Sequence, residues 1–204
     1  MIVLGITGGV GAGKSRILYD LKENHHAYIV EADKLAHDLM EAGQPVYRKI
    51  VDAFGAEILQ KEPPFSIDRN LFAQIVFHDS AKLERLNQIV HPAVKKWIQK
   101  DISNKKEEGC PIYVIEAALL IQDGYKEICD EIWYIYADEE TRTKRLIEQR
   151  GYTRERCEAM FRSQEPEDYY KKYADFTINN QFDYENSSKQ LNDRLNILCK
   201  NDII

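Results

Sequence analysis

The sequence has little cysteine and no long hydrophobic run. Its four cysteines are scattered, and they form neither a C-x-x-C pair nor a Cys/His spacing typical of metal sites. This argues against a disulfide-stabilised secreted protein and favours reduced thiols. No hydrophobic run approaches the roughly 18 residues that a membrane-spanning helix needs. The chain passes from Met1 directly into an apolar stretch, so we expect no signal peptide, no membrane association and a cytoplasmic location.

Positive charge is also scarce. The 204 residues include 28 Lys and Arg against 34 Asp and Glu, a net charge of −6. A general nucleic-acid binder usually carries a basic excess, so we expect no nucleic-acid partner. Internal repeats and low-complexity segments are absent, and 44% of the residues are hydrophobic, enough for one sizeable domain. The sequence leaves the oligomeric state open between a monomer and a small homo-oligomer.

The most informative stretch lies between residues 5 and 16. The residues that fit the P-loop pattern G-x-x-x-x-G-K-[ST] are Gly8, Gly13, Lys14 and Ser15. A short apolar run, readable as a buried strand, precedes the pattern, and apolar residues at helical spacing follow it. A glycine-rich turn with a stray Lys-Ser pair is the alternative, but the complete pattern between a strand and a helix favours a phosphate site.

Each residue type in this stretch has a physical role. Glycines allow positive φ and a close approach of the backbone to phosphate, and the loop N–H groups form an anion-binding nest at a helix N-terminus. Lys14 is expected to reach the β- and γ-phosphates, and the Ser15 hydroxyl to help hold Mg²⁺. The expected ATP-binding residues are Gly8, Gly11, Ala12, Gly13, Lys14, Ser15, Arg16, Arg142 and Asn179.

Two carboxylates follow β-prone runs. Asp33 comes after the run at 27–30, and Glu116 after the run at 112–115. Ligands of doubly wound sheets bind beyond the carboxyl ends of the strands. Asp33 is therefore a candidate to orient a hydroxyl nucleophile or to support Mg²⁺, or it is simply a helix N-cap; the roles are compatible. Glu116 stands where a Walker B acid would bind Mg²⁺, directly or through water.

The block from 34 to 108 shows no convincing strand. Its apolar spacing predicts helices near 34–42, 45–54, 68–77 and 80–104. Pro92 predicts a break or kink in the last helix. The block is too long for one crossover helix, so we read it as a helical insertion that binds the second substrate.

Residues 141–163 carry seven basic and three acidic side chains, a net charge of +4 in an acidic chain. A phosphate-binding lid explains this, because arginine forks match phosphate oxygens, although a solvated helix face is the alternative. We expect Arg145 and Arg150, rather than Gln149, to contact phosphate. Regular helix geometry favours Gln149, which lies closer to the face of Arg145. However, Gly151 predicts a helix end at Arg150, and a one-residue π-bulge would bring Arg150 back to that face. A neutral amide, in addition, cannot replace a guanidinium as a phosphate ligand.

Further strands are predicted at 131–137 and 176–179, followed by a C-terminal helix from about 187. Five short strands separated by helices predict an α/β protein with a P-loop NTPase-type five-stranded parallel sheet flanked by helices. The predicted core is 1–33, 110–140 and 170–204, with the insertion at 34–108 and the lid at 141–168.

This arrangement resembles the dephospho-coenzyme A kinase family over nearly the whole chain. The segments that carry the resemblance are Thr7–Ser15, Glu31-Ala32-Asp33 with Ala36-His37, Phe54-Gly55, Asp68-Arg69, Phe77, His91-Pro92, Leu119-Leu120, Arg145-Leu146, Gln164, Ala174-Asp175 and Ile178-Asn179-Asn180. The resemblance implies transfer of the ATP γ-phosphoryl group to the ribose 3′-hydroxyl of dephospho-CoA. It also implies that Asp33 faces this hydroxyl, that Mg²⁺ accompanies ATP, and that the helical domain receives the pantetheine-bearing substrate.

The chain departs from the family pattern at several positions. Glu116 replaces the usual aspartate, Ala118 a proline and Gln122 a glutamate. Arg142 stands where family members often carry Gln, and Arg16 replaces a threonine. Glu116 keeps its charge on a longer side chain, so the metal geometry can differ slightly, and none of these changes removes the phosphate, magnesium or base function.

Two other functions account for part of the sequence pattern. Another small nucleoside or nucleotide kinase would share the P-loop and lid, but it leaves the 31–37 segment and His91-Pro92 unexplained; a panel of acceptors with ATP separates the two. A non-catalytic nucleotide switch conflicts with the insertion, the basic lid and Asp33, and ATP turnover without an acceptor would favour it.

Overall fold

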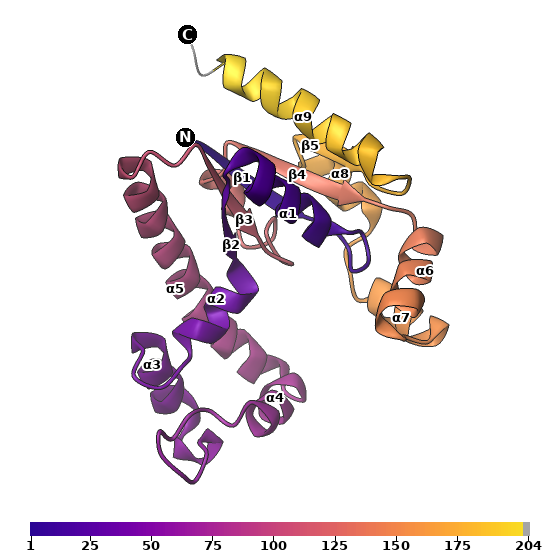
Figure 1. Ribbon diagram of the computed structural model, residues 1–204. Coiled ribbons are helices and arrows are strands. Elements are labelled where there is room, and N and C mark those ends of the chain that lie inside the picture. Colours follow the sequence, from indigo (N-terminus) through magenta and orange to yellow (C-terminus); the bar gives the residue numbers. More distant parts are fainter. Residues whose placement is uncertain (202–204) are drawn as a thin grey trace. The chain divides into compact units, whose positions relative to one another are not determined.

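A computed structural model describes residues 1–201 and shows a five-stranded sheet in the order β2-β3-β1-β4-β5 (Figure 1). The strands are β1 (Ile2–Thr7), β2 (Tyr28–Glu31), β3 (Ile112–Glu116), β4 (Glu131–Tyr136) and β5 (Phe176–Asn179). The pairings of β1 with β3, β1 with β4 and β4 with β5 are parallel. The predicted fold class, with its parallel sheet flanked by helices, is confirmed.

The chain divides into two compact units. The first comprises residues 1–30 and 105–204, and the second residues 31–104. The helices of the first unit are α1 (Lys14–His25), α6 (Glu139–Arg150), α7 (Arg154–Arg162), α8 (Glu167–Tyr173) and α9 (Tyr184–Asn201), with a short 3-10 turn η2 (Tyr125–Glu127). The helices at 14–25 and 184–201 lie along the same face of the sheet (Figure 1).

Alternation along β1 explains how this core forms. Ile2, Leu4 and Ile6 point to one face and pack in one buried cluster with apolar residues of α1 and α9, including Leu21 and Leu191. In a strand, successive side chains point to opposite faces. A continuous apolar run buried on both faces is typical of a central parallel strand, and all six residues of β1 are buried.

The register of the central strands positions the site. At the carboxyl end of β1, Ile6 pairs with Glu116 on one side, and Thr7 pairs with Tyr134 on the other. The carboxyl ends of β3 and β4 therefore flank the loop that follows Thr7. A residue placed just after any of these strands is brought to the same edge of the sheet.

The second unit is helical. Its helices are α2 (Ala32–Leu39), α3 (Pro45–Phe54), the 3-10 turn η1 (Ala56–Ile58), α4 (Arg69–Phe77) and most of α5 (Ser80–Glu107), which continues into the first unit. These match the helices predicted from apolar spacing. Phe54 and Phe72 pack edge to face, with ring centroids 5.0 Å apart. Residues 59 and 67 form an isolated antiparallel bridge.

Two local expectations need correction. The helix α5 runs without interruption through Pro92, so of the predicted break or kink the break is wrong, and the kink stays a prediction. Val90, Val94 and Ile98 are buried on both sides of the proline, and this packing stabilises the helix beyond its local propensity. Asp33 is not an N-cap, because α2 begins one residue earlier and Glu31 occupies that position. Asp33 lies in the first turn, where a carboxylate interacts favourably with the helix dipole. Among residues 1–201, no helix combines the length and apolar character of a membrane span.

Candidate functional site

The P-loop joins β1 to α1, as the sequence pattern requires. Gly13 is the N-cap of α1 and adopts the left-handed conformation, with φ 89° and ψ 24°. A residue with a Cβ rarely adopts this conformation, which explains why glycine precedes Lys14. Inside the loop the N–H of Ala12 donates to the carbonyl of Gly9, and the N–H of Arg16 donates to that of Gly13. The segment is therefore a tight turn opening a helix.

Lys14 is held at the centre of the loop. Its Nζ donates to the carbonyl oxygen of Gly8 at 2.8 Å and lies 3.5 Å from Oε1 of Glu116. The lysine comes from the start of α1 and the glutamate from the end of β3, and both side chains are largely buried. The fold thus brings together the predicted phosphate-binding cation and the predicted metal-binding carboxylate.

Arg142 lies against the P-loop from the side of α6. Its Nε donates to the carbonyl of Val10 at 2.8 Å, and Nη2 donates to Oε1 of Gln164 at 2.6 Å. The guanidinium stacks 4.1 Å from the centre of the Phe161 ring. A Cβ on Gly9 would lie 2.6 Å from the guanidinium carbon, so only glycine permits this approach. Burial lowers the pKa of Arg142, but an arginine remains charged at neutral pH.

Arg145 contacts the loop from the next turn of α6. It donates to the carbonyl of Ala12 at 3.3 Å and to the carbonyl of Asn180 at 2.7 Å. Two of the predicted basic residues therefore lie against the P-loop. Their guanidinium groups hold its carbonyl oxygens in this structure, beside the place where phosphate is expected.

The second lid arginine stays a prediction. Gly151 caps α6 in the left-handed conformation, with φ 64°, and its N–H donates to the carbonyls of Ile147 and Leu146. The predicted helix end at Arg150 is confirmed. The helix is α-helical from Glu139 to Arg150 without a π-bulge. Arg150 is consequently directed about 140° around the helix axis from Arg145, so a phosphate contact would require its long side chain to turn back from the helix end.

Asn180 is the residue that sequence reasoning missed. It follows β5 directly, is only 5% exposed, and its Nδ2 donates to the carbonyl of Ala12 at 2.7 Å. Its neighbour Asn179 was assigned to ATP instead, and the side chain of Asn179 accepts from the N–H of Gln181. The available signal was position, because a polar residue just beyond the last strand reaches the same sheet edge as the P-loop.

Three further predicted residues belong to α1 and α2. Ser15 is exposed in the first turn of α1. The guanidinium of Arg16 lies 4.4 Å from the ring centre of Tyr184, an arrangement typical of cation–π stacking. Asp33 belongs to the helical unit, where it is an exposed carboxylate of α2.

Oxygen donors suited to magnesium are present. Glu116 supplies a carboxylate and Ser15 a hydroxyl, which are ligand types that Mg²⁺ accepts. Among residues 1–201, no cluster of three or more His, Cys, Asp or Glu side chains is arranged to hold a metal. Mg²⁺ usually keeps several waters and is shared with substrate phosphates rather than enclosed by protein ligands.

The helical unit contains its own pocket of about 490 Å³. Buried Ile67, Phe72 and Val76 contribute apolar surface, while Glu41 and Arg69 contribute charged groups that pair with each other at 2.6 Å. An apolar pocket with a few polar groups is the usual form of a small-molecule site. Its lining thus combines apolar surface with charged and polar groups.

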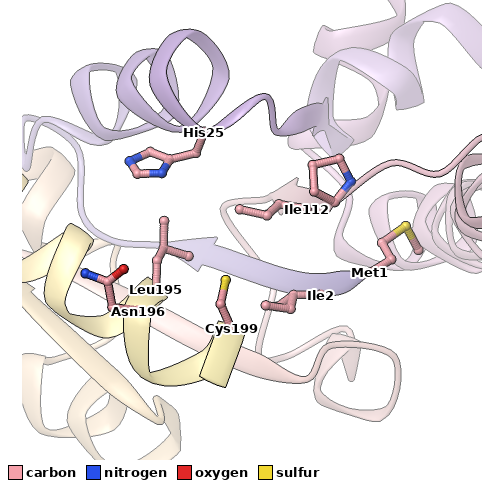
Figure 2. Close-up of a pocket in the computed structure, with 8 residues that line it drawn as sticks. Met1, Ile2, His25, Ile112, Leu195, Asn196 and Cys199 are labelled. Atoms are coloured by element: carbon pink, nitrogen blue, oxygen red, sulfur yellow. The ribbon is translucent and has the colours of Figure 1, made fainter. Parts of the chain in front are cut away.

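Another pocket, of about 400 Å³, lies elsewhere on the first unit (Figure 2). It is lined by the starts of β1 and β3, by His25 at the end of α1, and by Leu195 and Cys199 of α9. These are the amino ends of the strands, whereas the P-loop follows the carboxyl end of β1. This pocket is therefore separate from the phosphate site.

Comparison with known proteins identifies the family of the chain. The family model described as dephospho-CoA kinase matches residues 2–186. The dephospho-CoA kinase of Carboxydothermus hydrogenoformans is 36% identical, covering 93% of this chain and 90% of that protein. The dephospho-CoA kinase of Aquifex aeolicus is 37% identical, with 92% and 93% covered.

A solved structure described as TT1252 from Thermus thermophilus superposes with a TM-score of 0.79 at 26% identity, covering 97% of each chain. The matching family model and the similarity of the relatives extend over the P-loop, the helical unit and the basic helices alike. On these grounds the chain belongs to the dephospho-CoA kinase family.

Proposed function

We propose that the protein transfers the γ-phosphoryl group of ATP to the ribose 3′-hydroxyl of dephospho-CoA, giving CoA and ADP. The observation that carries the proposal is the placement of Lys14 between the Gly8 carbonyl and Glu116 in a P-loop of this family. A cation at this position neutralises the charge on the β- and γ-phosphates, and positioning with charge stabilisation accounts for most phosphoryl-transfer catalysis.

The nucleotide is assigned to the first unit. The proposed ATP-binding residues are Gly8, Gly11, Ala12, Gly13, Lys14, Ser15, Arg16, Arg142 and Asn179. The loop N–H groups bind phosphate oxygens, and residues 141–168 act as a basic lid. Arg145 and Arg150 are proposed to stabilise the transferring group, because a guanidinium presents several donors to phosphate oxygens.

Magnesium is proposed to bind Ser15 and Glu116, directly or through water. When bound, it would neutralise charge on the phosphate oxygens. The proposed role of Lys14 and Glu116 is to position positive charge beside the phosphate oxygens. On nucleotide binding, Lys14 is proposed to turn from its contacts with Gly8 and Glu116 to the phosphates, which leaves the Glu116 carboxylate available to Mg²⁺.

Asp33 is proposed as the acid that faces the 3′-hydroxyl and accepts its proton as the hydroxyl oxygen attacks the γ-phosphorus. The bond between that phosphorus and the bridging oxygen breaks, and ADP leaves with the electron pair. The helical unit is proposed to receive the pantetheine-bearing acceptor, with its pocket suited to a chain that alternates apolar segments and amides. The proposed enzyme is cytoplasmic, binds no nucleic acid, and acts as a monomer or small homo-oligomer.

The test is a mass measurement of products. Purified protein with Mg²⁺ and ATP should convert dephospho-CoA to CoA, and it should leave AMP, uridine and pantothenate largely unchanged. Faster turnover of any of these other acceptors would reject the substrate assignment. ATP hydrolysis that proceeds equally well without any acceptor would instead indicate a nucleotide switch.

A further inference from the structure

Asn180 makes an unusual number of fixed contacts with the phosphate loop and its surroundings. Besides the bond from Nδ2 to the Ala12 carbonyl, its Oδ1 accepts from the hydroxyl of Ser187 at 2.8 Å. Its backbone N–H donates to the carbonyl of Tyr136, and its own carbonyl accepts from Arg145. The side chain is buried, as are Ala12 and Ser187. Every polar group of this residue is therefore bonded.

The orientation of the amide follows from chemistry. A backbone carbonyl can only accept a hydrogen bond, so the atom of Asn180 that faces Ala12 must be the NH₂ group. The Ser187 hydroxyl can then donate to the remaining Oδ1. A Cβ on Gly13 would lie only 2.3 Å from Nδ2, so the amide rests directly on the Cα of the N-cap residue.

The bond to Ala12 has a consequence for the next N–H group. The carbonyl of residue 12 and the N–H of residue 13 belong to one planar trans peptide and point in opposite directions. Holding the Ala12 carbonyl toward Asn180 therefore directs the Gly13 N–H away from it. Arg142 holds the Val10 carbonyl in the same manner, which fixes the Gly11 N–H. The partners come from 168 and 132 residues away along the chain.

We propose that Asn180 is a positioning residue for phosphate binding: it fixes the Ala12–Gly13 peptide so that the Gly13 N–H is already aimed at the phosphate before nucleotide binds. The proposal rests on the proposed function in taking the loop as the nucleotide site. A purely structural residue would stabilise the fold without changing the affinity of the folded protein for phosphate. Preorganised donors, in contrast, lower the cost of ordering the loop at binding.

The experiment compares Asn180→Ala with Asn192→Ala. Asn192 is the matched control, because its amide bonds only within α9, to Ser188, on the same unit. Binding of inorganic tripolyphosphate and of ADP is measured by calorimetry on folded protein. Asn180→Ala should weaken both by about 10-fold, which corresponds to about 1.4 kcal/mol of added cost in ordering the loop at binding, while Asn192→Ala changes neither.

A spectroscopic signature separates positioning from stability. The amide signal of Gly13 in a ¹H–¹⁵N spectrum should shift on adding tripolyphosphate to the native protein, and should shift much less in Asn180→Ala. Ser187→Ala frees Oδ1 but keeps the bond to Ala12, so it should weaken binding by a smaller factor of about 3- to 5-fold. If Asn180→Ala does not fold, the proposal is tested by the affinity of the Ser187→Ala variant for tripolyphosphate and ADP.

Affinities within about 2-fold of the native values in folded Asn180→Ala, or in Ser187→Ala if the first variant is unfolded, would overturn the proposal. Failure of the native protein to phosphorylate dephospho-CoA, with the Asn180 effect on tripolyphosphate intact, would reject the proposed function alone.

Discussion

The two units differ in the kind of contact that each one makes around its own site. Around the P-loop, buried polar groups bond across long stretches of chain, as in the bonds of Arg142 and Asn180 to loop carbonyls. In the helical unit, apolar side chains such as Ile67 and Phe72 line the pocket together with polar ones. Its ion pair between Arg69 and Glu41 is exposed.

This difference indicates how each unit can work. Directional bonds fix the backbone of the phosphate site, so its geometry is set before ligand binds. Apolar packing specifies shape and volume but few directions, which suits a flexible acceptor. Changes in the first unit should therefore alter nucleotide binding and chemistry, and changes in the helical pocket should alter acceptor affinity.

The largest expected effect breaks this division, because Asp33 belongs to the helical unit but is proposed to take part in chemistry. Asp33→Asn should lower kcat by about 10²–10⁴-fold with ATP affinity retained, since an amide cannot accept the hydroxyl proton. The control is Asp38→Asn, an exposed acid on the same helix. Steady-state kinetics with titration of ATP decides; lost ATP affinity with normal kcat would make Asp33 a metal or structural residue.

Lys14→Ala should lower kcat by about 10²–10³-fold, a loss typical of removing one charge-stabilising group from an active site. The fold should survive, because the lysine sits at the first turn of α1 and not in the apolar core. Lys22→Ala, on the same helix, is the control. Near-normal kcat in a folded Lys14→Ala protein, judged by circular dichroism, would contradict the P-loop assignment.

Two adjacent lid residues, Gln149 and Arg150, should differ in their effect on activity. Arg150→Ala should lower kcat/KM by at least about 10-fold, a loss of about 1.4 kcal/mol, and Gln149→Ala by much less. The charge of a guanidinium outweighs the less favourable direction of Arg150 on the helix. Kinetics of both variants at saturating Mg²⁺ test this. Equal and small effects would place the phosphate contact elsewhere, with Arg142 the next candidate.

A change in the helical pocket should alter the KM for the acceptor and leave the KM for ATP unchanged. Ala73→Leu adds volume to its lining and should raise KM for dephospho-CoA by roughly 5- to 10-fold, with KM for ATP unchanged. Ala81→Leu adds the same volume at an exposed position outside the pocket and serves as the control. An unchanged KM for dephospho-CoA in Ala73→Leu would show that the acceptor binds elsewhere.

The smallest effect concerns stability in acid. Burial of Asp20 favours its neutral form, but hydrogen bonds from Tyr184, Asn24 and Ser188 outweigh this and lower its pKa. The resulting stabilisation is fully present above the unfolded pKa of about 3.9 and is lost as the pH falls through the lower folded value.

Tyr184→Phe should reduce the free energy of unfolding by about 1 kcal/mol at neutral pH and flatten its decline below about pH 4. Tyr47→Phe is the control in the helical unit, since that hydroxyl donates to the Phe65 carbonyl and to no carboxylate. Urea unfolding over a pH series measures both. An equally steep acid decline in Tyr184→Phe would show that Asp20 does not depend on this bond.

The sequence by itself determined the elements and the identity of the phosphate loop. Hydrophobic periodicity is a local signal, because it can be read from residues that are close together in the sequence. Strands such as 112–116 and helices such as 69–77 were therefore predictable. The P-loop was predictable for the same reason, because its strand, glycines, lysine and helix are contiguous. Even Gly151 as the end of α6 followed from local chemistry.

Only the tertiary structure decided which distant side chains hold that loop. Position at or just beyond the end of the last strand brings both Asn179 and Asn180 to the sheet edge of the P-loop, but only the fold shows that Asn180 is the one bonded to Ala12, 168 residues away. Tertiary packing likewise carried α5 through Pro92 against the local rule. Long-range contacts depend on register and packing between elements, and a single sequence specifies these only through the fold as a whole.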